Sequence, residues 1–192
     1  MRKLLLSAAL AAAVLAPTAA SAQALPAAVV AVVDLDRVSA DCNACKTAKA
    51  ALTSQIQAYQ TREKALTGPL QTEQRSIQAA VDALKGKEPD AALQARAKSW
   101  ETKRQSAAQE LAAQQQQIQR NQQYIQKQIQ DKLNPIYQQV MQRRGANVLV
   151  EVGATLATSQ SVEVTNDVLA ALNAALPSIA TQAPAQQQPQ GR

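Results

Sequence analysis

Two cysteines separated by two residues are the side chains of this sequence best suited to covalent chemistry. They form the segment Cys42-Asn43-Ala44-Cys45, and the sequence contains no other cysteine. Cys42 lies near the expected start of a helix, where a thiolate is stabilised as in disulfide-exchange proteins. No βαβ pattern typical of a thioredoxin-like domain surrounds the motif. A structural disulfide between Cys42 and Cys45 is therefore favoured, while two inert thiols and a redox-active pair stay open as alternatives.

Other enzymatic and metal chemistry has little support in the composition. The sequence has no histidine and only five glycines, so imidazole groups are absent and a glycine-rich phosphate loop is not expected. Two cysteines without histidine would complete a tetrahedral zinc site only across subunits. We therefore predict a protein that is not an enzyme and that needs no metal or cofactor.

The first residues have the pattern of a secretory signal peptide. A basic start, Met1 to Lys3, precedes the apolar stretch Leu4 to Ala16 and the small residues Ala20-Ser21-Ala22. The apolar stretch is shorter than the ~20 residues that a membrane anchor needs, which makes an anchor the less favoured alternative. We predict that residues 1–22 are removed and that the mature protein is periplasmic, in an oxidising compartment that favours the disulfide.

Short apolar segments near both chain ends predict a β-rich body made of residues 23–45 and 145–176. The runs Val29 to Val33, Asn147 to Val152 and Ser161 to Val164 are predicted strands, and Asp167 to Leu176 is a predicted helix. Three short strands leave edges and apolar faces that they cannot cover alone. We therefore expect the body to oligomerise through a core that includes Val30, Val32, Val148 and Val150.

Between these segments, residues 46–144 predict a long antiparallel helical hairpin, which makes the fold class α+β. Ser39 and Asp41 are the candidate N-caps of the first helix, and Gly68-Pro69 predicts a kink within it. Turn residues predict the tip at about residues 85–90. A second helix is expected from about Ala91 to Arg143, with Gly145 as its stop.

The second helix carries an apolar stripe interrupted by glutamine. Leu111, Ile118 and Ile125 mark a seven-residue period, and glutamine fills most of the positions between them. The apolar residues of such a stripe favour contact with a partner, but its glutamines prevent it from forming a dense apolar core. It predicts either weak, replaceable contacts with another chain or simple pairing of the two helices in a wet coiled coil.

The predicted hairpin is also the basic part of the sequence. Residues 46–144 contain 16 Lys and Arg against 8 Asp and Glu, whereas the flanking parts of the mature chain contain 2 against 6. Charges such as Lys98, Lys103 and Arg104 are expected to attract anionic partners over a distance, an effect that salt weakens. The plainer interpretation is a solvated helix surface.

This layout resembles the Skp/OmpH family of periplasmic chaperones for outer-membrane proteins. The resemblance is carried by the signal followed by VAVVDLDRV, by the charged hairpin, and by the block GANVLVEVGATLATSQSVEVTNDVLAALN from Gly145 to Asn173. It implies a homotrimer in which three arms enclose a cavity that holds unfolded outer-membrane proteins without ATP. Leu111, Ile118, Ile125, Lys98, Lys103 and Arg104 are then expected to contact clients, and an anionic membrane surface or lipopolysaccharide is a further expected partner.

Two features depart from the family pattern. One is the Cys42/Cys45 pair, and the other is the segment 177–192, whose low-complexity composition predicts a disordered tail. The main alternative function is that of a structural or adaptor hairpin of the cell envelope. A physiological nucleic-acid partner is not expected, because a signal peptide is present and aromatic side chains that stack on bases are scarce.

Overall fold

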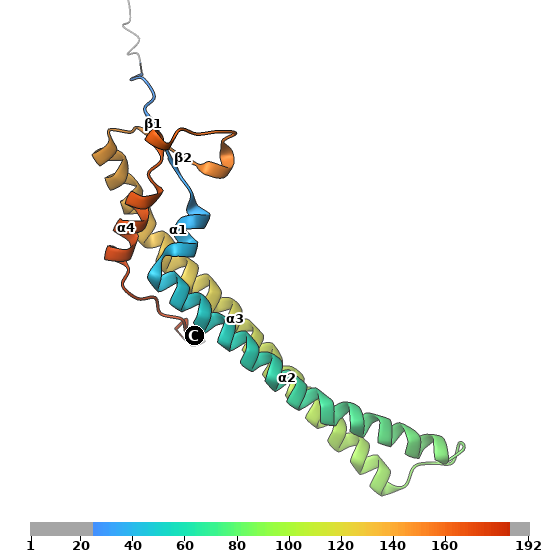
Figure 1. Ribbon diagram of the computed structural model, residues 1–192. Coiled ribbons are helices and arrows are strands. Elements are labelled where there is room, and N and C mark those ends of the chain that lie inside the picture. The colour runs from blue at the N-terminus through green and yellow to red at the C-terminus, as the bar shows by residue number, and fades with distance from the viewer. Residues whose placement is uncertain (1–24, 185–192) are drawn as a thin grey trace, which may run out of the picture.

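The computed structural model describes residues 25–184 and shows a long helical hairpin attached to a small body (Figure 1). The predicted signal peptide and residues 185–192 lie outside the described residues. In chain order the elements are β1 (Val30–Val33), α1 (Leu35–Asp41), α2 (Asn43–Ala83), α3 (Ala91–Arg144), β2 (Val148–Glu151), the 3-10 turns η1 (Val152–Ala154) and η2 (Gln160–Val162), and α4 (Thr165–Ala175). No helix within residues 25–184 combines the length and apolar character needed to cross a membrane.

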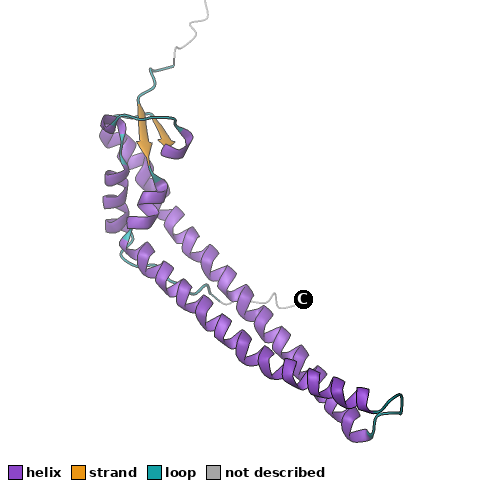
Figure 2. Cartoon of the chain, turned by 45° about the vertical axis from the view of Figure 1, so that its right-hand side comes forward, coloured by secondary structure: helices purple, strands orange, loops and turns teal. Residues whose placement is uncertain are grey.

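Helices α2 and α3 form the hairpin, as expected (Figure 2). At the tip, the carboxylate of Asp90 accepts a hydrogen bond from the backbone N–H of Leu93 and caps α3. Gly145 ends the same helix in the left-handed conformation, with φ 65°. Helix α2 continues through Pro69 and α3 through Pro135, so neither proline ends its helix.

The predicted N-caps Ser39 and Asp41 are wrong. The helical region begins earlier, because Asp34 caps α1 by accepting a hydrogen bond from the N–H of Arg37. Ser39 and Asp41 lie inside α1. The chain then breaks at Cys42, whose ψ of 123° is not helical and whose sulfur accepts from the N–H of Cys45 at the start of α2.

The body contains one parallel pair of strands, with Val30 opposite Val148 and Val33 opposite Glu151. The predicted third strand at Ser161 to Val164 is wrong. Residues 160–162 form a 3-10 turn that Ser159 caps, and only Glu163 bridges to Val32 among the described residues. Because Val164 is buried and α4 starts at once, too few residues remain for a ladder. The body is therefore more helical than predicted.

The body core lies where α1, α4, β1 and the base of α3 meet. Its largest fully buried apolar side chains are Val38, Val140, Val168 and Leu172. Thr165 is also fully buried, and its hydroxyl accepts a hydrogen bond from the N–H of Asp34. These contacts join residues from both ends of the chain, so a buried and mainly apolar core closes the base of the hairpin.

The segment that follows α4 turns back and runs beside the hairpin (Figures 1 and 2). The prediction of disorder is wrong for residues 177–184, the described part of the tail. Ile179 packs against the body core, and backbone groups of Ala180, Thr181 and Ala183 make hydrogen bonds with side chains of α2 and α3. The low-complexity composition is compatible with order here because helices α2 and α3, together called the arm, supply hydrogen-bond partners for the backbone of this segment.

Candidate functional site

The interrupted stripe of α3 faces α2 and forms a seam that is partly buried along its length. Leu111 and Ile118 are half-buried, whereas Ile125 is only 8% exposed. Of the three predicted client contacts in this stripe, Leu111 and Ile118 thus keep part of their surface accessible, whereas Ile125 keeps little. The stripe pairs the two helices, as the coiled-coil interpretation requires, while leaving part of its apolar surface open.

Amide side chains make the seam between α2 and α3 polar. Asn121 is buried, its Nδ2 donates to Oε1 of Gln55 across the hairpin at 2.8 Å, and its Oδ1 accepts from Nε2 of Gln117 at 2.7 Å. Periodicity in the sequence identified the polar interruption but not this network, because the register of α2 against α3 depends on the tip. Buried amides that satisfy one another hold the helices together without a continuous apolar core.

Two open grooves follow the seam. The groove nearer the body has a volume of about 430 Å³ and includes Tyr59, Gln114 and Ile118 in its walls. The groove nearer the tip has a volume of about 340 Å³ and includes Leu66, Leu70 and Lys103. Two predicted client contacts, Ile118 and Lys103, therefore line concave surfaces that contain both apolar and polar groups.

The three predicted basic contacts are exposed but differ in their surroundings. Nη2 of Arg104 lies 2.6 Å from Oε1 of Glu101, and its guanidinium carbon lies 5.8 Å from the ring centroid of Trp100. Hydrogen bonds from Arg104 and then from Gln105 lower the pKa of Glu101 to about 2. Lys98 and Lys103 make no ion pair within residues 25–184. Within these residues, their charges are therefore not offset by a direct ion pair.

Two exposed arginine–glutamate ion pairs connect α2 to α3. Nε of Arg62 lies 2.6 Å from Oε1 of Glu110, and Nε of Arg96 lies 2.6 Å from Oε1 of Glu73. Side-chain hydrogen bonding is the main cause that raises the pKa of each arginine and lowers the pKa of each glutamate. The indole N–H of Trp100 adds a 2.9 Å hydrogen bond to the carbonyl oxygen of Leu70. Sequence reasoning missed these pairs because each partner lies on the other helix.

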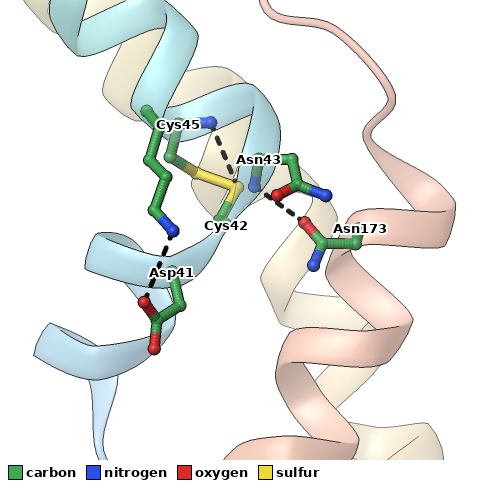
Figure 3. A network of polar contacts seen from close by, with 6 residues as sticks. Asp41, Cys42, Asn43, Cys45 and Asn173 are labelled. Carbon is green, nitrogen blue, oxygen red and sulfur yellow. Dashed lines mark hydrogen bonds and ion pairs between the residues drawn. A yellow bond between two sulfur atoms is a disulfide. The ribbon is translucent and has the colours of Figure 1, made fainter.

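The cysteine pair lies at the junction of α1 and α2, against α4 (Figure 3). The two sulfur atoms are 2.17 Å apart and are joined as a disulfide. Cys42 is fully buried and Cys45 is 7% exposed. The N–H of Asn43 donates to Oδ1 of Asn173 at 2.9 Å, which links this junction to α4. Because burial hinders attack by an external thiol, the geometry favours a structural bond over the redox-active alternative.

The four valines of the predicted oligomer core fall into two environments. Val30 and Val148 lie opposite each other in the sheet and are 41% and 38% exposed, next to the exposed Val29. Val32 is buried in the core of its own chain, and Val150 is half-buried. The exposed apolar surface of the sheet therefore lies at its Val30/Val148 end.

Comparisons with known proteins agree with this architecture. The family described as outer membrane protein (OmpH-like) matches residues 29–172. A crystal structure from Caulobacter crescentus CB15, described as a candidate outer membrane chaperone (OmpH-like), has a TM-score of 0.66 at 21% identity and covers 85% of this chain and 96% of its own. No curated protein matches the sequence. The chain therefore belongs to the OmpH-like family, which confirms the resemblance to the Skp/OmpH proteins noted in the sequence.

Proposed function

We propose that this protein is an ATP-independent periplasmic chaperone that holds unfolded outer-membrane proteins between helical arms and prevents their aggregation. Membership of the OmpH-like family and the fold shared with a candidate outer membrane chaperone support a chaperone role in general. The predicted signal peptide supports the periplasmic location. The observation that carries the specific proposal is the arm surface, on which apolar side chains line open grooves together with amides in one groove and with hydroxyls and charged groups in the other.

Such a surface suits a client that has no fixed shape. Dense, complementary packing selects one partner, whereas weak contacts repeated along an arm accept many sequences. Ile118, Leu66 and Leu70 offer apolar contact within the grooves, and the neighbouring amides and hydroxyls satisfy backbone groups of an unfolded chain. The basic charge of residues 46–144 adds attraction for acidic clients, and the same charge suits an anionic membrane surface or lipopolysaccharide.

A homotrimer assembled through the body completes the proposal. A two-stranded sheet is marginal alone and leaves edges open to pairing. Val29, Val30 and Val148 form an exposed apolar group at one end of this sheet, where contact with further copies would bury them. Assembly at the bodies brings several basic arms side by side, and the space between these arms is the proposed client cavity.

Light scattering during dilution of a urea-unfolded outer-membrane β-barrel protein tests the function. We expect the mature protein, added without ATP at one trimer per client, to suppress the rise in scattering. An equal mass of an unrelated helical protein is the control. Scattering that rises as fast as in the control would refute the chaperone proposal and favour an adaptor hairpin.

A further inference from the structure

The tail segment 178–184 lies on the arm as an unfolded chain would. It contains neither helix nor strand, and its side chains alternate between half-buried and exposed. Ile179, Thr181 and Ala183 are half-buried, whereas Ala180 and Gln182 are exposed. Alternation of this kind is typical of an extended chain seated on a surface.

The arm holds this segment through its main chain. Nε2 of Gln128 donates to the carbonyl oxygen of Ala180 at 2.8 Å, and Oε1 of the same amide accepts from the N–H of Ala180 at 3.0 Å. Nε2 of Gln55 donates to the carbonyl oxygen of Thr181 at 3.2 Å, and Oδ1 of Asn121 accepts from the N–H of Ala183 at 2.8 Å. All four hydrogen bonds use tail backbone atoms, so these bonds are independent of the tail side chains, while Ile179 adds apolar contact with the body core.

The amides that make these bonds are held in place. Asn121 is 3% exposed and is bonded to both Gln55 and Gln117, while Gln128 also donates to the carbonyl oxygen of Tyr124. An amide carries one donor group and one acceptor, as a peptide unit does, and therefore pairs with a main chain as a neighbouring strand would. Hydrogen bonds within the arm therefore help to fix the positions of Gln55, Asn121 and Gln128 where they meet the tail.

The spacing of the amides fits an extended chain. Asn121 and Gln128 are seven residues apart on α3, which corresponds to ~10.5 Å along a helix. Their partners Ala180 and Ala183 are three residues apart, which corresponds to ~10 Å in an extended chain. The next position of the same period is Gln114, which lines the 430 Å³ groove together with Gln182. The groove thus continues the row of amides beyond the point that Asn121 occupies.

We propose that Gln55, Asn121 and Gln128 form a sequence-independent binding site for the extended main chain of an unfolded polypeptide. In this structure the chain's own tail occupies the site, and a client displaces the tail when it binds. The inference rests on the proposed chaperone function for the identity of the client. It also gives the glutamine-rich face a specific role, because the main chain is the feature that all unfolded clients share.

A full-length double variant, Ala180→Pro with Ala183→Pro, frees the site without shortening the protein. Proline removes both donor N–H groups of the tail. Gln182→Pro is the matched control, because the N–H of Gln182 makes no hydrogen bond within the described residues. Adding Gln55→Ala and Gln128→Ala to the double variant removes two of the three arm amides, and Gln126→Ala, at an exposed arm position, controls for that change.

The first measurement uses peptides and does not depend on the chaperone function. Fluorescence anisotropy should show that a labelled peptide of residues 176–184 binds the Ala180→Pro, Ala183→Pro variant at least tenfold more tightly than the wild type. A peptide of scrambled sequence should bind the variant equally well, and a peptide N-methylated at the Ala180 and Ala183 positions should not bind. Preference for the native order over the scrambled one would overturn the proposal, since the tail would then be a sequence-specific strap.

The second measurement replaces the peptide with a urea-diluted, labelled outer-membrane β-barrel protein. We expect the double proline variant to bind this client about tenfold more tightly than the wild type and the Gln182→Pro control. The added alanines at residues 55 and 128 should remove that gain, whereas Gln126→Ala should preserve it. Equal client affinity in the wild type and in all variants would overturn client binding at this site. Absence of client binding combined with normal peptide binding would instead overturn the proposed function and leave the main-chain site intact.

Discussion

The body and the arm of this protein are built from different kinds of contact. In the body, Val38, Val140 and Leu172 are fully buried and touch residues from both chain ends. In the arm, most seam residues are half-buried, and Asn121 is a buried polar residue. Exposed arginine–glutamate ion pairs connect the two helices. The body therefore has one tightly defined arrangement, whereas the arm keeps apolar and amide groups within reach of another chain.

The two kinds of contact differ in whether they leave room for another polypeptide chain. A close-packed apolar core tolerates neither voids nor inserted chains, which suits a region that must fix the base of the hairpin. A seam of satisfied amides exchanges one hydrogen-bond partner for another at modest cost, because each net hydrogen bond contributes only about 1 kcal/mol. The tail contacts Gln128 and Asn121 through hydrogen bonds of this kind.

A matched pair of leucine truncations tests this contrast with the largest expected effect. Leu172→Ala in the body should lower the free energy of unfolding by about 2–5 kcal/mol, because it leaves a cavity in a fully buried site. Leu111→Ala in the arm should cost about 1 kcal/mol, since the side chain is only half-buried. Urea unfolding followed by circular dichroism measures both. Equal losses would mean that the seam is packed as densely as the body.

The disulfide should contribute less than the body core. Titration of the denatured protein with a thiol reagent should find no free thiol, and Cys42→Ala with Cys45→Ala should lower stability by about 2 kcal/mol for so short a loop. Client holding should be unchanged in the double variant, because the pair lies at the junction of α1 and α2 and not in the grooves. Two free thiols, or loss of holding, would contradict a structural role.

Charge should affect the arm and spare the body. Reversing Lys98, Lys103 and Arg104 to Glu should slow capture of an unfolded outer-membrane protein several-fold, with most of the effect from Lys98 and Lys103, which make no ion pair within residues 25–184. The body control Glu163→Gln should change the rate little. Salt should slow wild-type capture as the screening length shrinks from ~10 Å at 0.1 M to ~3 Å at 1 M. Stopped-flow fluorescence with a labelled client measures the capture rate. A rate that is insensitive to salt and to the reversals would mean that the basic residues of the arm form only a solvated helix surface.

The smallest expected effect is a dependence of arm stability on pH. Hydrogen bonding from Arg96 lowers the pKa of Glu73, so this contribution is fully present above the ordinary carboxyl pKa and is lost as pH falls through the lowered value. Glu73→Gln should slightly lower the thermal midpoint at pH 7 and have no effect once pH is below that lowered pKa. The effect of Leu172→Ala should persist over the same range. A deficit of Glu73→Gln that persists in acid would point to geometry instead of charge.

Most of the helical architecture could be predicted from the sequence because its signals are local. The apolar period of α2 and α3, the cap at Asp90 and the stop at Gly145 all depend on residues close in sequence. The strands at Val30–Val33 and Val148–Glu151 were also predictable, since their β-branched runs are short and apolar. Of the site, periodicity indicated the wet stripe and located Ile118 on it.

The errors and omissions involve partners that are distant in sequence. Alternation over SVEV predicted a strand, yet only Glu163 finds a bridge partner, in Val32, and α4 begins directly afterwards. The pairs Arg62–Glu110 and Arg96–Glu73 require the register of one helix against the other. The tail lacks an apolar pattern, and its order comes from amides on α2 and α3. No local pattern contains that information.

Site-specific photo-crosslinking tests most directly whether the arm holds the client while the body does not. A photoreactive phenylalanine analogue would replace Ile118 in the arm groove or, in a second protein, the exposed Ala170 on α4 of the body. Each protein would be irradiated with a urea-diluted outer-membrane β-barrel protein, and the products would be separated on a denaturing gel. We predict a crosslinked client from residue 118 and none above background from residue 170. Crosslinking from residue 170 that equals or exceeds crosslinking from residue 118 would contradict the division between an assembling body and a client-holding arm.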